Sequence, residues 1–235
     1  MRDAFFFDLD DTLYDEETYV SSGFMEVAGF LSELVPNSPS STEIHEMLML
    51  ILKESGRGKV FDTILNQFGI ANEGLVHTLL YIYRTHSPID LVIPDELQLI
   101  IRDLQNFGVT TGIITDGTHV TQNQKLNRLR PQIKWDVQVC TDVLGVKNWK
   151  PSKTPFIVAR NLIRNEIKRW FYLGDNENKD FAGAAKAGFT TLWWNPDHRV
   201  LSDNLVAPDY QITTYSELSQ FILNKGIISD EPPPK

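Results

Sequence analysis

The chain has 235 residues and a formal net charge of -9, and its apolar and charged fractions are those of an ordinary globular protein. The acidic balance argues against sequence-independent binding to nucleic acid, which needs a basic surface. The single cysteine excludes an intrachain disulfide, and no stretch is long enough to span a membrane. We expect no signal peptide, because the apolar run near the amino terminus is far too short for one. We therefore expect a cytoplasmic protein whose partners are neither nucleic acid nor membrane.

The first part of the chain combines one strand with a long helical stretch. The aromatic-rich apolar run at residues 4–7 predicts a buried strand over residues 4–8. From Asp15 to about Pro88 the spacing of the apolar residues is helical throughout. Ser40 and Glu43 have the spacing of a capping box at the start of one of these helices. The sequence predicts an all-helical insertion at residues 15–88.

After Pro88 the pattern changes to strands that alternate with helices. Strands are predicted at 109–114, 136–140, 170–173 and 190–194, and helices at about 94–107, 118–130, 154–163, 182–187 and 216–223. This alternation is typical of an α/β fold with a doubly wound parallel sheet. We therefore predict a Rossmann-like core domain from residues 1–14 and 89–225, a helical domain at 15–88, and a flexible tail at 226–235.

The most informative motif is Asp8-Leu9-Asp10-Asp11-Thr12, which follows the first strand directly. Two carboxylates so close together raise each other's pKa unless a cation or hydrogen bonds compensate. A hard divalent cation such as Mg²⁺, which prefers oxygen ligands, would resolve the conflict and suits phosphoryl chemistry. The alternative is a strand followed by a simple Asx turn.

Further polar residues stand where other predicted strands end. Thr115 and Asp116 follow the second strand, and Asp175 follows a later one. In open α/β sheets, ligands bind beyond the carboxyl ends of the strands. Because these residues and Asp8 all belong to that one edge, the sequence predicts a single active site there.

Four motifs in this order resemble those of the haloacid dehalogenase superfamily, specifically its phosphatases with an inserted helical cap domain. Asp8, Asp10 and Thr12 fit the first motif and Thr115 fits the second. The third fits Lys150, followed by Pro151 and Phe156, and the fourth fits Gly174, Asp175 and Asp180. The resemblance covers nearly the whole chain.

The resemblance implies a phosphatase that acts on a small soluble phosphate ester through a covalent aspartyl phosphate. Asp8 would be the nucleophile, and Asp10 would protonate the leaving oxygen and later accept a proton from water. Carboxylates of Asp8 and Asp175, with the main-chain carbonyl of Asp10, would bind Mg²⁺, and Asp180 would support these ligands or bind through water. In the dehalogenase and phosphonatase branches the position of Asp10 carries no carboxylate.

The same resemblance implies how the phosphoryl group is held. Thr115 and the N–H groups near Asp116 and Gly117 would bind its oxygens, and Lys150 would neutralise the nucleophile and the transferring group. Asp116 departs from the asparagine common in close relatives, and the sequence leaves the role of its side chain open.

Plainer interpretations stand beside these. Lys150 could be a solvated lysine, Thr115 a strand-end cap, and Asp180 the cap of the following helix. The Gly56-Arg57-Gly58-Lys59 segment lacks the spacing of a nucleotide-binding loop, and we interpret it as a loop of the helical insertion. A phosphomutase of the same superfamily and a non-catalytic binding protein are the alternative functions. The sequence indicates neither the particular substrate nor the oligomeric state.

Overall fold

A computed structural model describes residues 2–35, 37–70 and 72–229 of the chain. The chain divides into two compact units. The helical unit comprises Glu16–Leu91 together with Asn123–Arg128, and the core unit comprises Met1–Asp15, Val92–Gln122 and Leu129–Lys235.

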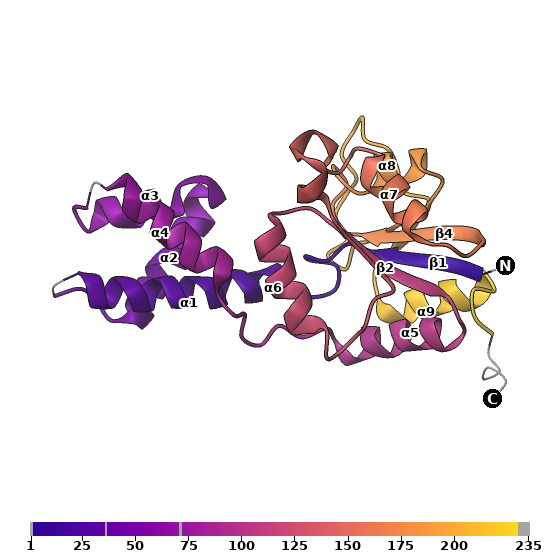
Figure 1. Cartoon of the computed structure of the whole chain (residues 1–235), viewed down its shortest axis with the longest axis horizontal. Helices are drawn as coiled ribbons and strands as arrows, with labels where there is room; N and C mark the ends of the chain where they lie inside the picture. Colours follow the sequence, from indigo (N-terminus) through magenta and orange to yellow (C-terminus); the bar gives the residue numbers. More distant parts are fainter. Residues whose placement is uncertain (1, 36, 71, 230–235) are drawn as a thin grey trace. The chain divides into compact units, whose positions relative to one another are not determined.

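The described residues of the helical unit between Glu16 and Leu91 form α1 (Glu16–Leu34), α2 (Ser41–Ser55), the 3₁₀ turn η1 (Arg57–Lys59), α3 (Val60–Gln67) and α4 (Glu73–Thr85) (Figure 1). The predicted capping box is present, because Ser40 and Glu43 bond to each other's backbone N–H at the start of α2. Phe24, Phe61 and Tyr83 pack edge to face or tilted in the apolar centre of the unit. Within the described ranges, no helix has both the length and the apolar character of a membrane span.

The core unit is built on a parallel sheet whose described strands are β1 (Arg2–Phe7), β2 (Thr110–Thr115), β3 (Val137–Cys140), β4 (Ile167–Gly174), β5 (Thr190–Trp194) and β6 (Tyr210–Ile212). Every pairing is parallel, and the order across the sheet is β3-β2-β1-β4-β5-β6. The predicted α/β class with a doubly wound parallel sheet is confirmed. The strand β6 was not predicted, because it has three residues, two of them exposed.

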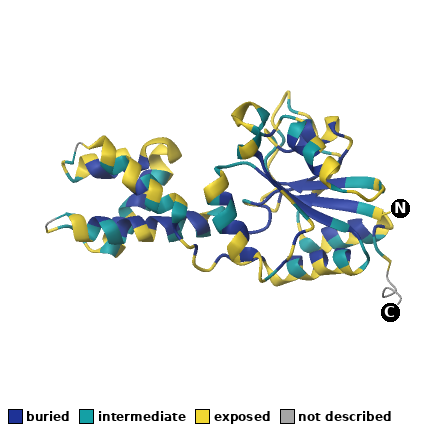
Figure 2. Ribbon diagram, viewed as in Figure 1, coloured by how far each residue is buried: buried dark blue, intermediate teal, exposed yellow. Residues whose placement is uncertain are grey.

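Side chains on both faces of the central strand β1 are buried, which explains its continuous apolar run. Phe6 contacts Trp170 and Phe189 on one face. Phe5 stacks on Phe171 on the other face. Figure 2 shows the resulting dark band of buried residues along the sheet.

Helices cover the two faces of the sheet. On one side lie α5 (Asp95–Asn106) and α9 (Tyr215–Asn224), and on the other lie α7 (Thr154–Leu162) and α8 (Phe181–Lys186) (Figure 1). The remaining described elements are α6 (His119–Leu129), η2 (Thr141–Leu144) and η3 (Val146–Asn148). Of the predicted flexible tail, residues 230–235 lie outside the described residues, and Ile227 is buried.

The strand order places a switch point between β1 and β4. The chain proceeds from β1 through β2 to β3 in one direction and from β4 through β5 to β6 in the other. Asp8 directly follows β1, Asp175 directly follows β4, and the backbone N–H of Asp8 donates to the carbonyl of Leu173 at 2.8 Å. Because the crevice beyond such a switch point is where α/β sheets bind ligands, the topology positions both carboxylates at the expected binding edge.

Candidate active site

A buried lysine joins two of the predicted carboxylates. The Nζ atom of Lys150 lies 2.8 Å from Oδ1 of Asp8 and 2.7 Å from Oδ1 of Asp180. It also donates to the hydroxyl of Tyr172 at 3.0 Å. Lys150 is only 5% exposed, so the interpretation of this residue as a solvated lysine is wrong.

The electrostatics of this group follow from its burial. Burial raises the pKa of the Asp8 carboxyl well above its usual range, against the lowering effect of Lys150 and with a further rise from the carboxylates of Asp180 and Asp175. Burial lowers the pKa of the Lys150 ammonium, but the nearby Asp180 and Asp8 carboxylates outweigh that effect and raise it. The lysine is therefore a permanent cation in the pH range of most enzymes.

Asp175 joins the group from the end of β4. Burial and the carboxylates of Asp180 and Asp11 raise its pKa to about 7, against the lowering influence of Lys150 and Arg199. The guanidinium of Arg199 lies 3.8 Å from its Oδ2 and donates to its carbonyl at 2.8 Å. The indole N–H of Trp193 donates to the same carbonyl at 2.9 Å, which fixes the backbone that carries this carboxylate.

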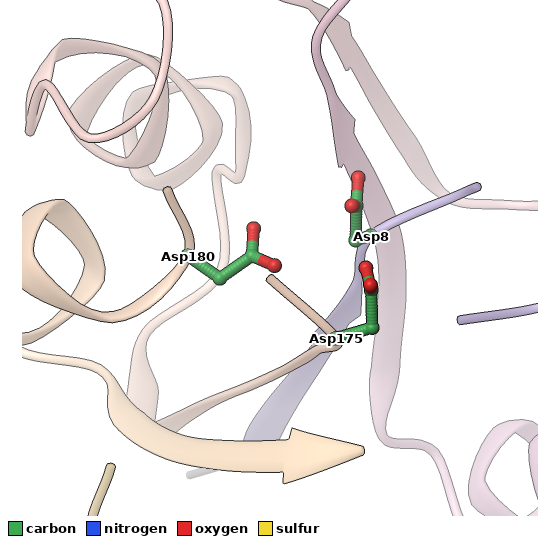
Figure 3. A group of neighbouring side chains, drawn as sticks. All are labelled: Asp8, Asp175 and Asp180. Atoms are coloured by element: carbon green, nitrogen blue, oxygen red, sulfur yellow. The ribbon is translucent and has the colours of Figure 1, made fainter. Parts of the chain in front are cut away.

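Asp8, Asp175 and Asp180 form a group that could hold a metal ion. One carboxylate oxygen from each lies within 4.8 Å of the others, and Figure 3 shows the three side chains converging from separate segments. Three buried carboxylates exceed the charge that Lys150 supplies, and an all-oxygen donor set suits a hard divalent cation. The residues present therefore fit a metal such as Mg²⁺.

Asp180 does not behave as a helix cap. It stands before α8, but its side chain makes no capping hydrogen bond to that helix. Its Oδ2 accepts from the backbone N–H of Asn176 at 2.8 Å, and its Oδ1 accepts from the Tyr172 hydroxyl at 2.9 Å. These contacts orient the carboxylate toward Lys150 and Asp8, so the capping interpretation is wrong.

Thr115 is the last residue of β2, and Asp116 and Gly117 follow it in the turn after the strand. The Oγ1 atom of buried Thr115 donates to the Asp116 carbonyl at 3.3 Å. The Asp116 carboxylate, whose role was open, accepts through Oδ1 from the Thr141 hydroxyl at 2.6 Å and from the backbone N–H of Lys150 at 3.1 Å. It thus ties the turn after β2 to the segment that carries the lysine.

The carboxylate of Asp10 lies outside the group of three. Its Oδ2 accepts from the side-chain amide of Gln122 at 3.1 Å, and its Oδ1 accepts from the hydroxyl of Tyr14. The same Gln122 amide lies 2.6 Å from Oγ1 of Thr115. Sequence reasoning missed Gln122, Tyr14 and Tyr172 as site residues.

The structure thus brings Asp8, Lys150, Asp175 and Asp180 into direct contact or close proximity, and links Asp10 to Thr115 through Gln122. The family motifs in the sequence predict that Asp8, Lys150, Asp175 and Asp180 belong to one site. Tyr172 stands in a run of apolar residues that gives it no distinguishing signal. Gln122 stands with Lys125 and Leu126 in a Gln-x-x-Lys-Leu pattern that resembles a nucleotidase-like branch of the family, but this pattern points to a substrate class and not to a contact with Asp10, which is 112 positions away.

The comparison with protein families agrees with this geometry. Residues 5–194 match the family described as haloacid dehalogenase-like hydrolase. The matched region contains all four motifs and most of the chain. The protein therefore belongs to the haloacid dehalogenase-like hydrolase family, and the resemblance stated from its motifs is confirmed.

The alignments with curated relatives cover most of the chain. The chain is 29% identical over 201 residues to a glyceraldehyde 3-phosphate phosphatase of Methanopyrus kandleri, with 82% of this chain and 83% of the relative covered. It is 27% identical over 229 residues to a protein of the same name from Methanothermobacter thermautotrophicus, with 94% and 98% covered.

Solved structures support the fold. The HAD hydrolase YfnB of Bacillus subtilis, solved with bound magnesium, has a TM-score of 0.67 and 21% identity, with 94% of this chain and 98% of that chain covered. A 2-haloacid dehalogenase of Pseudomonas syringae has a TM-score of 0.61 and 23% identity, with 96% and 100% covered. At these identities the similarity establishes the fold alone.

Proposed function

We propose that this protein is a Mg²⁺-dependent phosphomonoester hydrolase that acts on a small phosphorylated metabolite through an aspartyl phosphate on Asp8. The observation that carries the proposal is the contact of the buried Lys150 ammonium with Asp8, beside two further carboxylates. A carboxylate nucleophile needs cations at its side if it is to approach an anionic phosphate.

The first half-reaction forms a bond between a carboxylate oxygen of Asp8 and phosphorus and breaks the bond from phosphorus to the ester oxygen. Asp10, in its protonated form, donates a proton to the departing oxygen and thereby becomes a carboxylate. Thr115 and the N–H groups near Asp116 and Gly117 hold the phosphoryl oxygens, and Lys150 stabilises the charge that develops on them.

In the second half-reaction, the Asp10 carboxylate accepts a proton from water as the water oxygen attacks phosphorus. The bond from phosphorus to Asp8 breaks, phosphate leaves, and both aspartates return to their starting forms. Asp8, Asp175 and the main-chain carbonyl of Asp10, supported by Asp180, would hold Mg²⁺, which would supply positive charge next to the nucleophile and the phosphoryl oxygens. We assign the helical domain at residues 15–88 the role of a cap that selects the substrate.

Asp10 separates this proposal from its nearest rival, a dehalogenase. The family's dehalogenase branch carries no carboxylate at that position, because a halide leaves without a proton. Here the carboxylate is present and is held by two hydrogen-bond donors, Gln122 and Tyr14. We therefore expect phosphate release from esters and no chloride release from 2-chloropropionate. Release of phosphate to water would also argue against a phosphomutase and against a non-catalytic protein.

The direct test is hydrolysis of p-nitrophenyl phosphate by the purified protein with MgCl₂, before and after EDTA. We expect activity that EDTA abolishes and added Mg²⁺ restores. Replacing Asp8 by Asn should lower the rate by at least about 10³-fold, as loss of a nucleophile does. The matched control is Asp95→Asn, since Asp95 is exposed at the start of α5.

A panel of phosphorylated metabolites would then define the substrate class. Glyceraldehyde 3-phosphate belongs in the panel because relatives with 26–29% identity are named for it. Hydrolysis that survives both EDTA and Asp8→Asn would overturn the proposed function, and so would a wild-type protein that releases no phosphate from any ester of the panel.

A further inference from the structure

Gln122 is a buried polar side chain to which none of the four family motifs assigns a role. It lies on α6 and is 1% exposed. Its Nε2 atom lies 3.1 Å from Oδ2 of Asp10, 2.6 Å from Oγ1 of Thr115 and 2.9 Å from the carbonyl of Asp116. One amide group therefore reaches the proposed acid–base residue and the turn proposed to bind phosphate.

Tyr14 approaches the same carboxylate from the other side. It is buried, and its hydroxyl donates to Oδ1 of Asp10 while Gln122 donates to Oδ2. A carboxylate whose two oxygens each accept a bond from a buried donor loses the freedom to rotate about its side-chain torsions. The pair thus defines one orientation of the Asp10 side chain.

The turn after β2 packs against this glutamine. Gly117 has φ of +128°, and a Cβ atom placed on it would lie 3.0 Å from Cδ of Gln122. A glycine there allows the backbone to approach the amide closely. The position of the turn and the orientation of Asp10 are consequently fixed by the same side chain.

We propose that Gln122, assisted by Tyr14, is a positioning residue that holds the Asp10 carboxylate in register with the phosphate-binding turn, so that Asp10 can protonate the leaving oxygen. This inference rests on the proposed function, in which Asp10 serves as the general acid. A general acid must lie within hydrogen-bond reach of the oxygen that departs, and a shift of about 1 Å can cost two orders of magnitude in rate.

The inference predicts a dependence on the leaving group. Nitrophenolate departs from p-nitrophenyl phosphate with little need for a proton, whereas phenolate departs from phenyl phosphate as a poor leaving group that benefits from one. The quantity kcat/KM covers the steps up to departure of that group. Weaker phosphate binding lowers kcat/KM for both esters alike, so the ratio of the two values isolates protonation by Asp10.

The experiment measures this ratio, p-nitrophenyl phosphate over phenyl phosphate, for the wild type and for two variants. Gln122→Met keeps the size of the side chain and removes its hydrogen bonds, and Tyr14→Phe removes one donor without touching Thr115. We expect the ratio to rise about 10-fold in Gln122→Met and to rise also in Tyr14→Phe, because a positioned acid contributes about 10²–10⁴-fold and only part is lost.

The matched control is Gln105→Met. The Gln105 amide donates at 2.8 Å to the side chain of Thr111 and at 2.9 Å to the carbonyl of Lys134, so the same change removes comparable bonds beside the start of β2. Its ratio should equal that of the wild type. If Gln122→Met does not fold, judged by circular dichroism, Tyr14→Phe carries the test alone.

An active wild type whose ratio stays within about twofold in every folded variant at these two positions would overturn the inference and leave the proposed function intact. A wild-type protein inert toward both esters would instead overturn the proposed function, and the inference with it.

Discussion

The ammonium group of Lys150 and the carboxylate of Asp8 are in direct contact, 2.8 Å apart, in a buried site. The same ammonium lies 2.7 Å from Oδ1 of Asp180, so one cation contacts two carboxylates from distant parts of the sequence. Removing one partner of a buried ionic group leaves the others without compensation, which costs more than the pair itself contributes.

Replacing Lys150 by Met should therefore destabilise the protein as well as inactivate it. We expect the free energy of unfolding in EDTA to fall by about 3 kcal/mol at pH 8 and by less at pH 5, where the orphaned carboxylates can take up protons. Urea titrations at the two pH values measure this difference. Lys147→Met is the control, since Lys147 is exposed and close by in the chain. Equal stability of the two variants at pH 8 would contradict the expectation.

Gly174, the last residue of β4, leaves the space that the Asp180 side chain fills. A Cβ atom at this position would lie 2.5 Å from Cγ of the fully buried Asp180, so the side chain of Asp180 would have to shift. Gly174→Ala should displace the carboxylate from Lys150 and reduce kcat/KM by about 10²-fold. It should also reduce the rise in melting temperature that MgCl₂ produces.

The control for that substitution is Gly29→Ala. A Cβ atom on Gly29, which lies within α1, would meet nothing within 4 Å. We expect this variant to be as stable as the wild type or slightly more stable, because alanine favours helix over glycine by up to about 1 kcal/mol. A Gly174→Ala protein with full activity and an unchanged response to MgCl₂ would show that Asp180 can move without consequence.

The parts of the site that sequence predicts are those fixed by local patterns. An apolar run followed by Asp8 or by Asp175 places a carboxylate at a strand end, and the parallel sheet then gathers those ends at one edge. The Ser40–Glu43 capping box was predictable for the same reason, since both partners lie within one turn.

The parts that sequence does not predict depend on contacts between distant segments. Gln122 reaches Asp10 only because the first turn of α6 lies against the loop after β1. Tyr172 resembles any aromatic residue of a buried strand until its hydroxyl is found beside Asp180. The strand β6 is recognised by its pairing with β5, because three residues carry no usable periodicity.

Two substitutions at Asp116 separate the effect of its negative charge from the effect of its hydrogen bonds. Its Oδ1 atom accepts from the Thr141 hydroxyl and from the backbone N–H of Lys150, whereas its Oδ2 atom is buried with no hydrogen-bond partner among the residues that the structure describes. Asp116→Asn keeps the accepting oxygen and removes a negative charge next to the phosphate-binding turn. We expect its kcat/KM to stay within about threefold of the wild type or to rise.

Asp116→Ala should behave differently from Asp116→Asn. It leaves the Lys150 N–H and the Thr141 hydroxyl without their acceptor, which costs about 1–3 kcal/mol of stability and loosens the segment that carries the lysine. Urea unfolding and kcat/KM measured side by side distinguish the two variants. If both variants lose the same activity, the charge of Asp116 matters and its hydrogen bonds do not.

The group of Asp8, Asp175 and Asp180 predicts that the stability of the metal-free protein falls as pH rises. The pKa of Asp175 is raised to about 7 by burial and by the carboxylates of Asp180 and Asp11. Folded protein therefore holds a proton on Asp175 that the unfolded chain releases above about pH 4. Where the folded state binds more protons, stability falls as pH rises, so this contribution is lost between about pH 4 and pH 7.

The measurement compares wild type with Asp175→Asn in EDTA by urea unfolding at several pH values. Relative to the variant, the wild type should lose a few kcal/mol of unfolding free energy across that window. MgCl₂ should reverse the loss, because carboxylates bind the cation in their ionised form, and its stabilising effect should increase with pH. A difference between the two proteins that stays constant from pH 4 to pH 8 would mean that Asp175 is ionised without metal, and that Lys150 and Arg199 alone balance the group.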